Sequence, residues 1–181
     1  MKTTSKRRSN PGQRLLEFFL ENPTGKFYES EAREKAGVSL GAANKHLKEL
    51  ASRGILLLER KGRMNFLQLN RENQLVKQLK IARSLSLPFI NELREAGKRL
   101  GIKIYIYGSV ARGEDVEDSD VDVLLIGNAN RAAIEKIISE IRKKTGKIIK
   151  ISLYTRREWA GMKRGDPAFY ESVERDRKEI A

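Results

Sequence analysis

The chain has 181 residues, enough for one large or two small domains, and 39% of them are hydrophobic while 34% are charged. It contains no cysteine and one histidine, His46, which excludes disulfides, thiol catalysis and zinc sites rich in cysteine or histidine. No apolar run approaches the roughly 18 residues that span a bilayer, and residues 1–10 lack the apolar segment of a signal peptide. We therefore expect a cytoplasmic protein.

The positive charge is concentrated in the first half of the chain. Of the net charge of +13, residues 1–84 carry +10, with 18 basic and 8 acidic residues, and the remainder carries +3. This asymmetry indicates a polyanionic partner for the first half. The alternative is a chain that is basic throughout for no specific purpose.

Three short helices are predicted in the first half. Asn10 followed by Pro11 is a typical helix start, and that helix ends near Asn22. After an extended piece at residues 26–28, Ser30 is expected to cap a second helix that runs to Ala36. Ser39 is expected to cap a third that runs to residue 53, with a buried stripe of Leu40, Ala43, Leu47 and Leu50.

Two predicted strands, residues 55–59 and 64–69, are joined by the basic tip Arg60-Lys61-Gly62-Arg63 and form a hairpin. Three helices followed by a basic hairpin, together with the stretch VSLGAANKHLKELASRGIL, resemble a winged helix-turn-helix over residues 11–70. The resemblance implies that helix 39–53 enters the major groove of double-stranded DNA while the hairpin grips the backbone.

The side chains that would contact DNA lie on one helix face and at the hairpin tip. They are Asn44, Lys45, Lys48, Arg60, Lys61 and Arg63, with Lys6, Arg7 and Arg8 as a basic arm. The alternative for these charges is a solvated surface. His46 is interpreted either as a further DNA contact or as a partly buried ring beside the hairpin.

The predicted organisation has three parts: a DNA-binding domain at 1–70, a linker helix at 71–85 and a second domain at 86–181. The linker places Leu75, Val76, Leu79 and Ala82 on one side. It would pack on the first domain, join the two domains, or pair with a second subunit in a homodimer.

The second domain alternates predicted helices and strands, which indicates a small α/β layer. Helices are expected at 86–100, at 132–144, after a capping box of Thr155 and Glu158, and from Asp166-Pro167. Strands are expected at 102–107, 121–126 and 147–154.

The stretch GSVARGEDVEDSDVD, residues 108–122, carries the candidate site. A strand ends at Gly108-Ser109, and the next begins at Asp120 and Asp122. Residues two apart on a strand face the same way, so the two carboxylates project together. Such a pair beside a Gly-Ser turn suits a hard divalent cation held against phosphate oxygens.

The same stretch matches the pattern Gly-Ser-x-Ala-Arg-Gly, five residues, Ser-Asp-x-Asp. Residues 86–181 thus resemble the minimal nucleotidyltransferases of the DNA polymerase β superfamily, which implies a mixed sheet. The resemblance implies that Gly108, Ser109 and Arg112 bind the nucleotide, with loop-pinning as the alternative for Arg112. Asp120 and Asp122 would be catalytic and bind one or two Mg²⁺ or Mn²⁺ ions with an NTP, which we expect to be ATP.

The match departs from the superfamily at one point. Active members carry a third carboxylate on the next strand, and residues 147–154 contain no acid. Lys150 or Ser152 stands about where that acid belongs. The loop acids Glu114, Asp115, Glu117 and Asp118 are the candidate substitutes, and turnover is left open.

Two functions follow. The first is an enzyme that moves a nucleoside monophosphate from an NTP to a hydroxyl; the resemblance implies a protein acceptor such as the toxin of a two-gene pair, with this chain as antitoxin. The alternative is a transcriptional regulator whose degenerate nucleotidyltransferase domain is a nucleotide sensor or docking module. A template-free polymerase is less favoured, because the domain is small and shows no separate primer-binding module.

Overall fold

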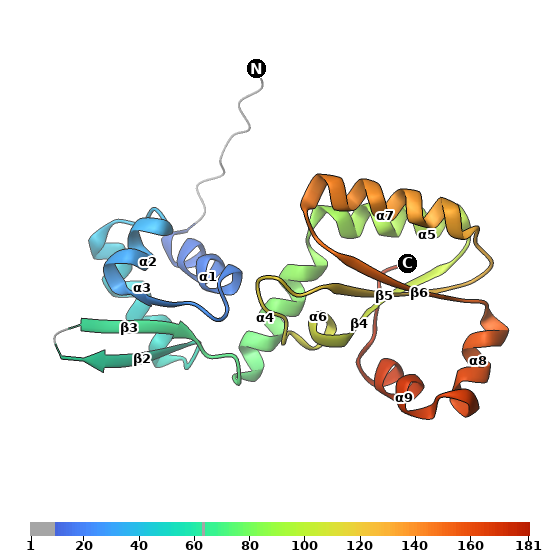
Figure 1. Ribbon diagram of the computed structural model, residues 1–181. Coiled ribbons are helices and arrows are strands. Elements are labelled where there is room, and N and C mark those ends of the chain that lie inside the picture. The colour runs from blue at the N-terminus through green and yellow to red at the C-terminus, as the bar shows by residue number, and fades with distance from the viewer. Residues whose placement is uncertain (1–9, 63) are drawn as a thin grey trace, which may run out of the picture. The chain divides into compact units, whose positions relative to one another are not determined.

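The computed structural model describes residues 10–62 and 64–181. Arg63 and the predicted arm of Lys6, Arg7 and Arg8 lie outside the described residues. The chain divides between Val76 and Lys77 into two compact units (Figure 1), each described by itself below. In the described part of the chain, no helix has the length and apolar character needed to cross a membrane.

The first unit has the predicted order of three helices followed by a hairpin. A short strand lies between the first two helices and joins the hairpin in an antiparallel sheet of order β1-β3-β2. The elements are α1 (Pro11–Glu21), β1 (Lys26–Tyr28), α2 (Glu29–Lys35), α3 (Leu40–Ser52), β2 (Leu56–Lys61) and β3 (Met64–Leu69).

The starts of α1 and α3 are as predicted, although the Ser39 side chain makes no capping hydrogen bond, and the start of α2 differs. The Asn10 side chain accepts a hydrogen bond from the Gly12 amide at 2.9 Å. The prediction that Ser30 caps the second helix is wrong, because β1 runs directly into α2 and Tyr28 takes the cap position. Leu40 is also not a core residue: it opens α3, before the buried stripe begins, and is 64% exposed.

Helix α4 (Gln74–Leu85) buries a different set of residues from the predicted stripe. Val76, Lys80 and Ile81 are buried, whereas Leu75 is 48% exposed and Ala82 is also exposed. Lys80 can be buried because its Nζ forms an ion pair with Asp115 Oδ1 at 3.0 Å. A hydrophobic pattern treats every lysine as polar and could not place it there.

The second unit is a mixed four-stranded sheet with helices on both faces, which confirms the predicted α/β arrangement. The sheet order is β6-β5-β4-β7; β5 is parallel to β6, and the other pairs are antiparallel. The elements are α5 (Pro88–Leu100), β4 (Lys103–Tyr107), α6 (Gly108–Arg112), β5 (Val121–Ile126), α7 (Arg131–Thr145), β6 (Ile149–Tyr154), α8 (Arg156–Gly165), α9 (Pro167–Asp176) and β7 (Lys178–Glu179).

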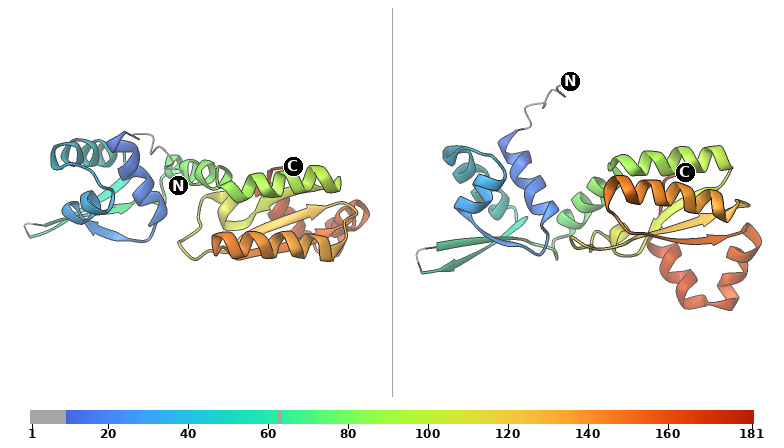
Figure 2. Two further views of the ribbon diagram at one scale, coloured as in Figure 1. Left: turned by 90° about the horizontal axis from the view of Figure 1, so that it is seen from above. Right: turned by 45° about the horizontal axis from the view of Figure 1, so that its top comes forward.

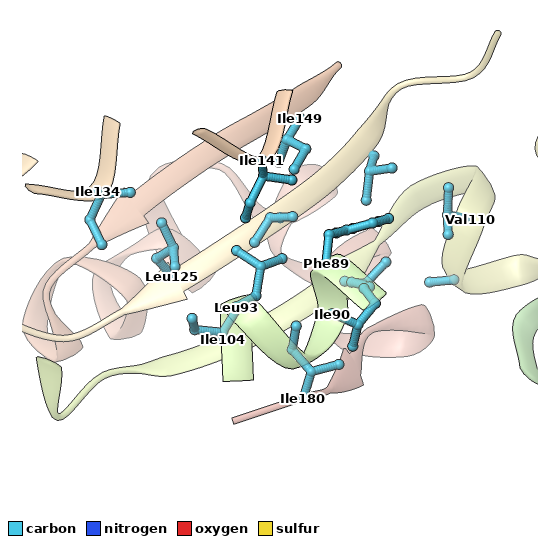
Figure 3. Packing of buried hydrophobic residues seen from close by; sticks show 14 of the residues in the cluster. Phe89, Ile90, Leu93, Ile104, Val110, Leu125, Ile134, Ile141, Ile149 and Ile180 are labelled. Carbon is cyan, nitrogen blue, oxygen red and sulfur yellow. The ribbon is translucent and has the colours of Figure 1, made fainter. Parts of the chain in front are cut away.

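Helices α5 and α7 lie side by side on one face of this sheet, and α8 and α9 lie on the other (Figures 1 and 2). The residues of β5 alternate between the faces. Val121, Val123 and Leu125 join the core under α5 and α7, part of which is shown in Figure 3. Leu124 and Ile126 instead pack with residues of α8 and α9. Asp122 shares that second face, which decides where the candidate site opens.

The caps that begin α8 and α9 are as predicted. Thr155 and Glu158 form a capping box, and the Asp166 side chain accepts from the Phe169 amide. Each cap satisfies backbone donors that the first turn of a helix leaves without an intrahelical partner.

Candidate functional site

The Gly-Ser turn lies directly against one of the two aspartates. Gly108 has φ +72°, and a Cβ atom added there would lie 2.6 Å from Asp122 Oδ2. The approach follows from strand pairing, since Tyr107, the residue before the turn, is paired with Asp122 across β4 and β5. A side chain at position 108 would therefore be strained and would also displace Asp122.

The two aspartates lie at the start of β5. Asp122 is the second residue of the strand, and Asp120 precedes the strand by one residue. Lys150 of β6 is the parallel partner of Asp122, and its Nζ lies 2.6 Å from Asp120 Oδ2. The three charged groups therefore form one cluster, in which a lysine stands beside the carboxylates.

The second residue considered for the missing acid, Ser152, has a structural contact. It pairs with Leu124, and its hydroxyl lies 3.1 Å from the Tyr107 hydroxyl. Neither Lys150 nor Ser152 supplies an anionic oxygen.

Burial and charge act in opposite directions on Asp122. Burial raises the pKa of its carboxyl, Lys150 and Arg112 lower it, Asp120 raises it, and the net shift is upward. The hydrogen bond to Asp120 raises the pKa of Lys150, so the lysine is charged at neutral pH. Burial is also the main cause of the raised pKa of Tyr107.

Arg112 bridges its own loop and the last helix. Its Nε donates to Glu114 Oε2 at 2.8 Å, and one terminal nitrogen donates to Asp176 Oδ2 at 3.2 Å. These hydrogen bonds raise the pKa of Arg112. They favour the loop-pinning interpretation of Arg112, and its predicted contact with nucleotide phosphate stays a prediction.

The loop acids considered as substitutes are engaged elsewhere or have no defined role. Glu114 also contacts Lys77 Nζ at 3.2 Å, and Asp115 forms the ion pair with Lys80. Glu117 accepts from Lys147 Nζ through its backbone carbonyl at 3.0 Å, and Asp118 is exposed. Within residues 10–62 and 64–181, no three acidic or histidine side chains are grouped to hold a metal ion.

The number of metal ions that Asp120 and Asp122 can bind depends on how many anionic oxygens are available as ligands. Mg²⁺ is commonly held by one or two carboxylates together with phosphate oxygens and water, and Asp120 with Asp122 fits one such ion. Two ions would need further anionic ligands, and one oxygen of Asp120 already faces an ammonium group. The residues present therefore fit a single divalent ion.

The described side chains predicted to contact DNA are all exposed in the first unit. Asn44, Lys45 and Lys48 lie on α3, opposite its buried stripe, and Arg60 and Lys61 lie at the end of β2. A groove of about 430 Å³ runs beside Asn44; its lining includes Tyr28, Arg33, Leu40 and Met64.

His46 is partly buried, as one of its two interpretations expected, but its neighbour is a helix. The side chain is 20% exposed, and its Nδ1 lies 3.4 Å from a carboxylate oxygen of Glu49. A Cβ atom added at Gly12 of α1 would lie 2.8 Å from that nitrogen. The ring therefore packs against α1, and its placement beside the hairpin stays a prediction.

Sequence reasoning identified the acids and missed part of what surrounds them. In the sequence, Lys150 was considered only as the residue at the position of the missing acid. The hydrogen bonds of Tyr107 with Ser152 and of Asp176 with Arg112 were not predicted. The position of Lys150 beside Asp122 follows from the parallel register between β5 and β6, which no local sequence pattern indicates.

Comparison with known proteins places this site in a family. A family model described as a nucleotidyltransferase domain matches residues 89–179, half of the chain. The chain therefore belongs to the nucleotidyltransferase domain family. The match lies within the second unit and contains the turn, both aspartates and Lys150.

One relative is a protein of Methanocaldococcus jannaschii whose name offers protein adenylyltransferase as its proposed activity. It is 31% identical over 61 residues, which make up 34% of this chain and 61% of the relative. The chain thus spans about three fifths of that relative's length.

Proposed function

We propose that the second unit binds an NTP, expected to be ATP, and transfers its nucleoside monophosphate to a hydroxyl group of a partner protein. The observation that carries this proposal is the close approach of the Gly108 turn to Asp122, with Asp120 beside it. Family membership supports nucleotide transfer in general, and the proposed activity in the relative's name supports a protein acceptor.

In this proposal, the turn contacts the phosphates and the two aspartates bind the metal ion. Gly108 and Ser109 are partly exposed and let phosphate oxygens approach the backbone of the turn. Asp120 and Asp122 would hold one Mg²⁺ or Mn²⁺ ion. When bound, that ion would neutralise part of the negative charge of the phosphates. The acceptor hydroxyl oxygen attacks the α-phosphorus and its proton is released to solvent, while the bond from that phosphorus to the α–β bridging oxygen breaks and pyrophosphate leaves with that oxygen.

The test is label transfer from ATP carrying radioactive α-phosphate, in the presence of Mg²⁺. The product of the adjacent gene is the first acceptor to try, because the resemblance to antitoxins implies a toxin partner. We expect labelled acceptor, with at least a hundredfold slower labelling by D120N/D122N. The control is E140Q, which removes an exposed acid of α7 and should label normally. No transfer, or transfer undiminished in D120N/D122N, would overturn the proposal.

A second candidate, DNA binding that regulates transcription, rests on the first unit. The exposed Asn44, Lys45 and Lys48 lie on α3, and the first unit, residues 1–76, has 15 basic and 8 acidic residues, a net charge of +7. In this proposal the second unit would act as a nucleotide sensor or docking module, and Lys150 in place of an acid favours that reduced role. A homodimer would allow a palindromic operator to be read.

Salt-dependent binding to duplex DNA tests this candidate. K45A/K48A should weaken binding and reduce the slope of log affinity against log salt by up to about 2, because each lysine that neutralises a phosphate adds about one unit to that slope. The control is K136A/K143A, which removes two exposed lysines of α7 in the second unit. Equal affinity for DNA and heparin would count against a DNA-binding role.

A further inference from the structure

The register of the parallel strands fixes where Lys150 emerges. Asp122 and Lys150 are paired across β5 and β6, and paired residues of neighbouring strands point to the same face of a sheet. This is the face on which Leu124 packs against Trp159 of α8, and Lys150 and Asp122 are not part of that apolar cluster. Lys150 therefore reaches the acid pair as a consequence of backbone pairing.

The contact with Asp120 distinguishes Lys150 from the neighbouring lysine. Its ammonium lies 2.6 Å from Asp120 Oδ2, while its side chain is 63% exposed. Lys147, before the same strand, instead donates to the Glu117 carbonyl at 3.0 Å and holds the loop. Of these two lysines, Lys150 is the one directed at the carboxylates.

The charges at the cluster explain what this contact does. Two ionised aspartates carry −2, and the ammonium leaves −1. One divalent ion is still attracted to that charge, whereas a second would meet an excess of positive charge with no third acid to bind it. With one N–H group directed at Asp120, the ammonium has two N–H groups left that can donate to phosphate oxygens, and it supplies positive charge where a second metal ion would otherwise do so.

We propose that Lys150 is a built-in cation of this site, which takes the place of one of two divalent ions, so that the site binds an NTP with a single ion. The role of Lys150 toward the nucleotide rests on the proposed function above. Its effect on ion binding does not, because it depends only on the acid pair and the lysine.

The experiment is a Mn²⁺ titration followed by electron paramagnetic resonance on the full chain, first with Mn²⁺ alone. K150Q keeps a polar side chain of similar length and removes the charge, and K136Q is the control for losing one exposed lysine elsewhere. We expect K150Q to bind Mn²⁺ about five- to thirtyfold more tightly than the wild type, with K136Q unchanged. K150R, which keeps the charge, should bind as the wild type does.

Equal Mn²⁺ affinity in K150Q and K136Q would overturn the proposal, as would the absence of Mn²⁺ binding in all variants at millimolar concentration. In a second arm with a non-hydrolysable ATP analogue, the wild type should bind one Mn²⁺ per chain, and two ions would overturn the proposal. If the analogue binds to no variant, the proposed function fails, and the titration with Mn²⁺ alone still decides the role of Lys150.

Discussion

The sheet face under α8 and α9 has two ends that differ in chemistry although one strand runs through both. At one end Leu124 and Ile126 of β5 pack with Tyr105, Trp159 and Val173. At the other end the same strand face carries Asp122, beside Tyr107 and Lys150. A step of two residues along β5 separates a closed apolar cluster from an open charged one.

The difference shows how the second unit divides stability from chemistry. Leu124 is fully buried, so it contributes free energy of folding through removal of apolar surface from water. Asp122 is half-buried, and burial raises its pKa, so its charged form is held at a cost. The apolar end provides the rigid frame on which the charged end depends.

The largest expected effect on stability comes from removing a large buried side chain from the apolar end. Trp159 is 6% exposed, lies among the rings of Tyr154 and Tyr170, and donates from Nε1 to Glu174 at 2.9 Å. We expect W159A to lower the free energy of unfolding by about 3–5 kcal/mol, measured by circular dichroism during urea unfolding. R164A, an exposed change on the same helix, should stay within about 0.5 kcal/mol of the wild type. A loss below about 1 kcal/mol for W159A would mean that this cluster is not what stabilises the unit.

A smaller effect is expected at the turn that meets the charged end. Gly108 and Gly146 have almost the same φ, +72° and +71°, but an added Cβ meets Asp122 at 2.6 Å at Gly108, whereas at Gly146 it meets none of the described residues within 4 Å. G146A should therefore lower the free energy of unfolding by about 1 kcal/mol, through strain of the left-handed backbone alone. G108A should lower it by about 2–3 kcal/mol, because the added Cβ also meets Asp122. Equal costs in thermal unfolding would show that Asp122 moves aside freely. Binding of a fluorescent ATP analogue should be lost in G108A and kept in G146A.

Most of the helices and strands of the second unit could be predicted because their signals are local. The capping box at Thr155, the cap at Asp166 and the glycine after Leu100 lie next to the turns that they begin or end. The acid pair could be predicted for the same reason, since its spacing and the Gly-Ser turn lie in one short stretch. Strand β7, two residues long, has no such signal and is held by pairing with β4.

What could not be predicted depends on contacts between distant parts of the chain. The ion pair of Lys150 with Asp120 requires the register of two parallel strands, and the burial of Lys80 requires Asp115 from a distant loop. In the first unit, Leu40 fits the helical spacing of a core residue, yet it opens α3 and is largely exposed. Periodicity indicates which residues could be buried, and tertiary packing decides which are.

A further prediction concerns the hydrogen bond between the hydroxyl groups of Tyr107 and Ser152, whose oxygens lie 3.1 Å apart. A double-mutant cycle of Y107F, S152A and their combination should give a coupling free energy of about 1 kcal/mol in urea unfolding. The single variants should bind Mn²⁺ as the wild type does, because neither residue supplies a ligand. Additive single effects would show that the two hydroxyls do not depend on each other.

The smallest effect on stability is expected where the effect on function is large, at Asp122. Burial raises the pKa of Asp122 above its value in the unfolded chain. The folded state therefore binds a proton at this carboxyl more readily than the unfolded state does. The wild type should thus gain stability as pH falls through that raised pKa, whereas D122N should lack this contribution to the pH dependence. At neutral pH the free energy of unfolding of D122N should lie within about 0.5 kcal/mol of the wild type or slightly above it, and D122N should lack the nucleotidyl transfer proposed above. Thermal unfolding between pH 4 and pH 8, run beside D118N as the control acid, measures this. A large destabilisation of D122N would mean that the charged end also maintains the fold, so that stability and chemistry are not divided along β5.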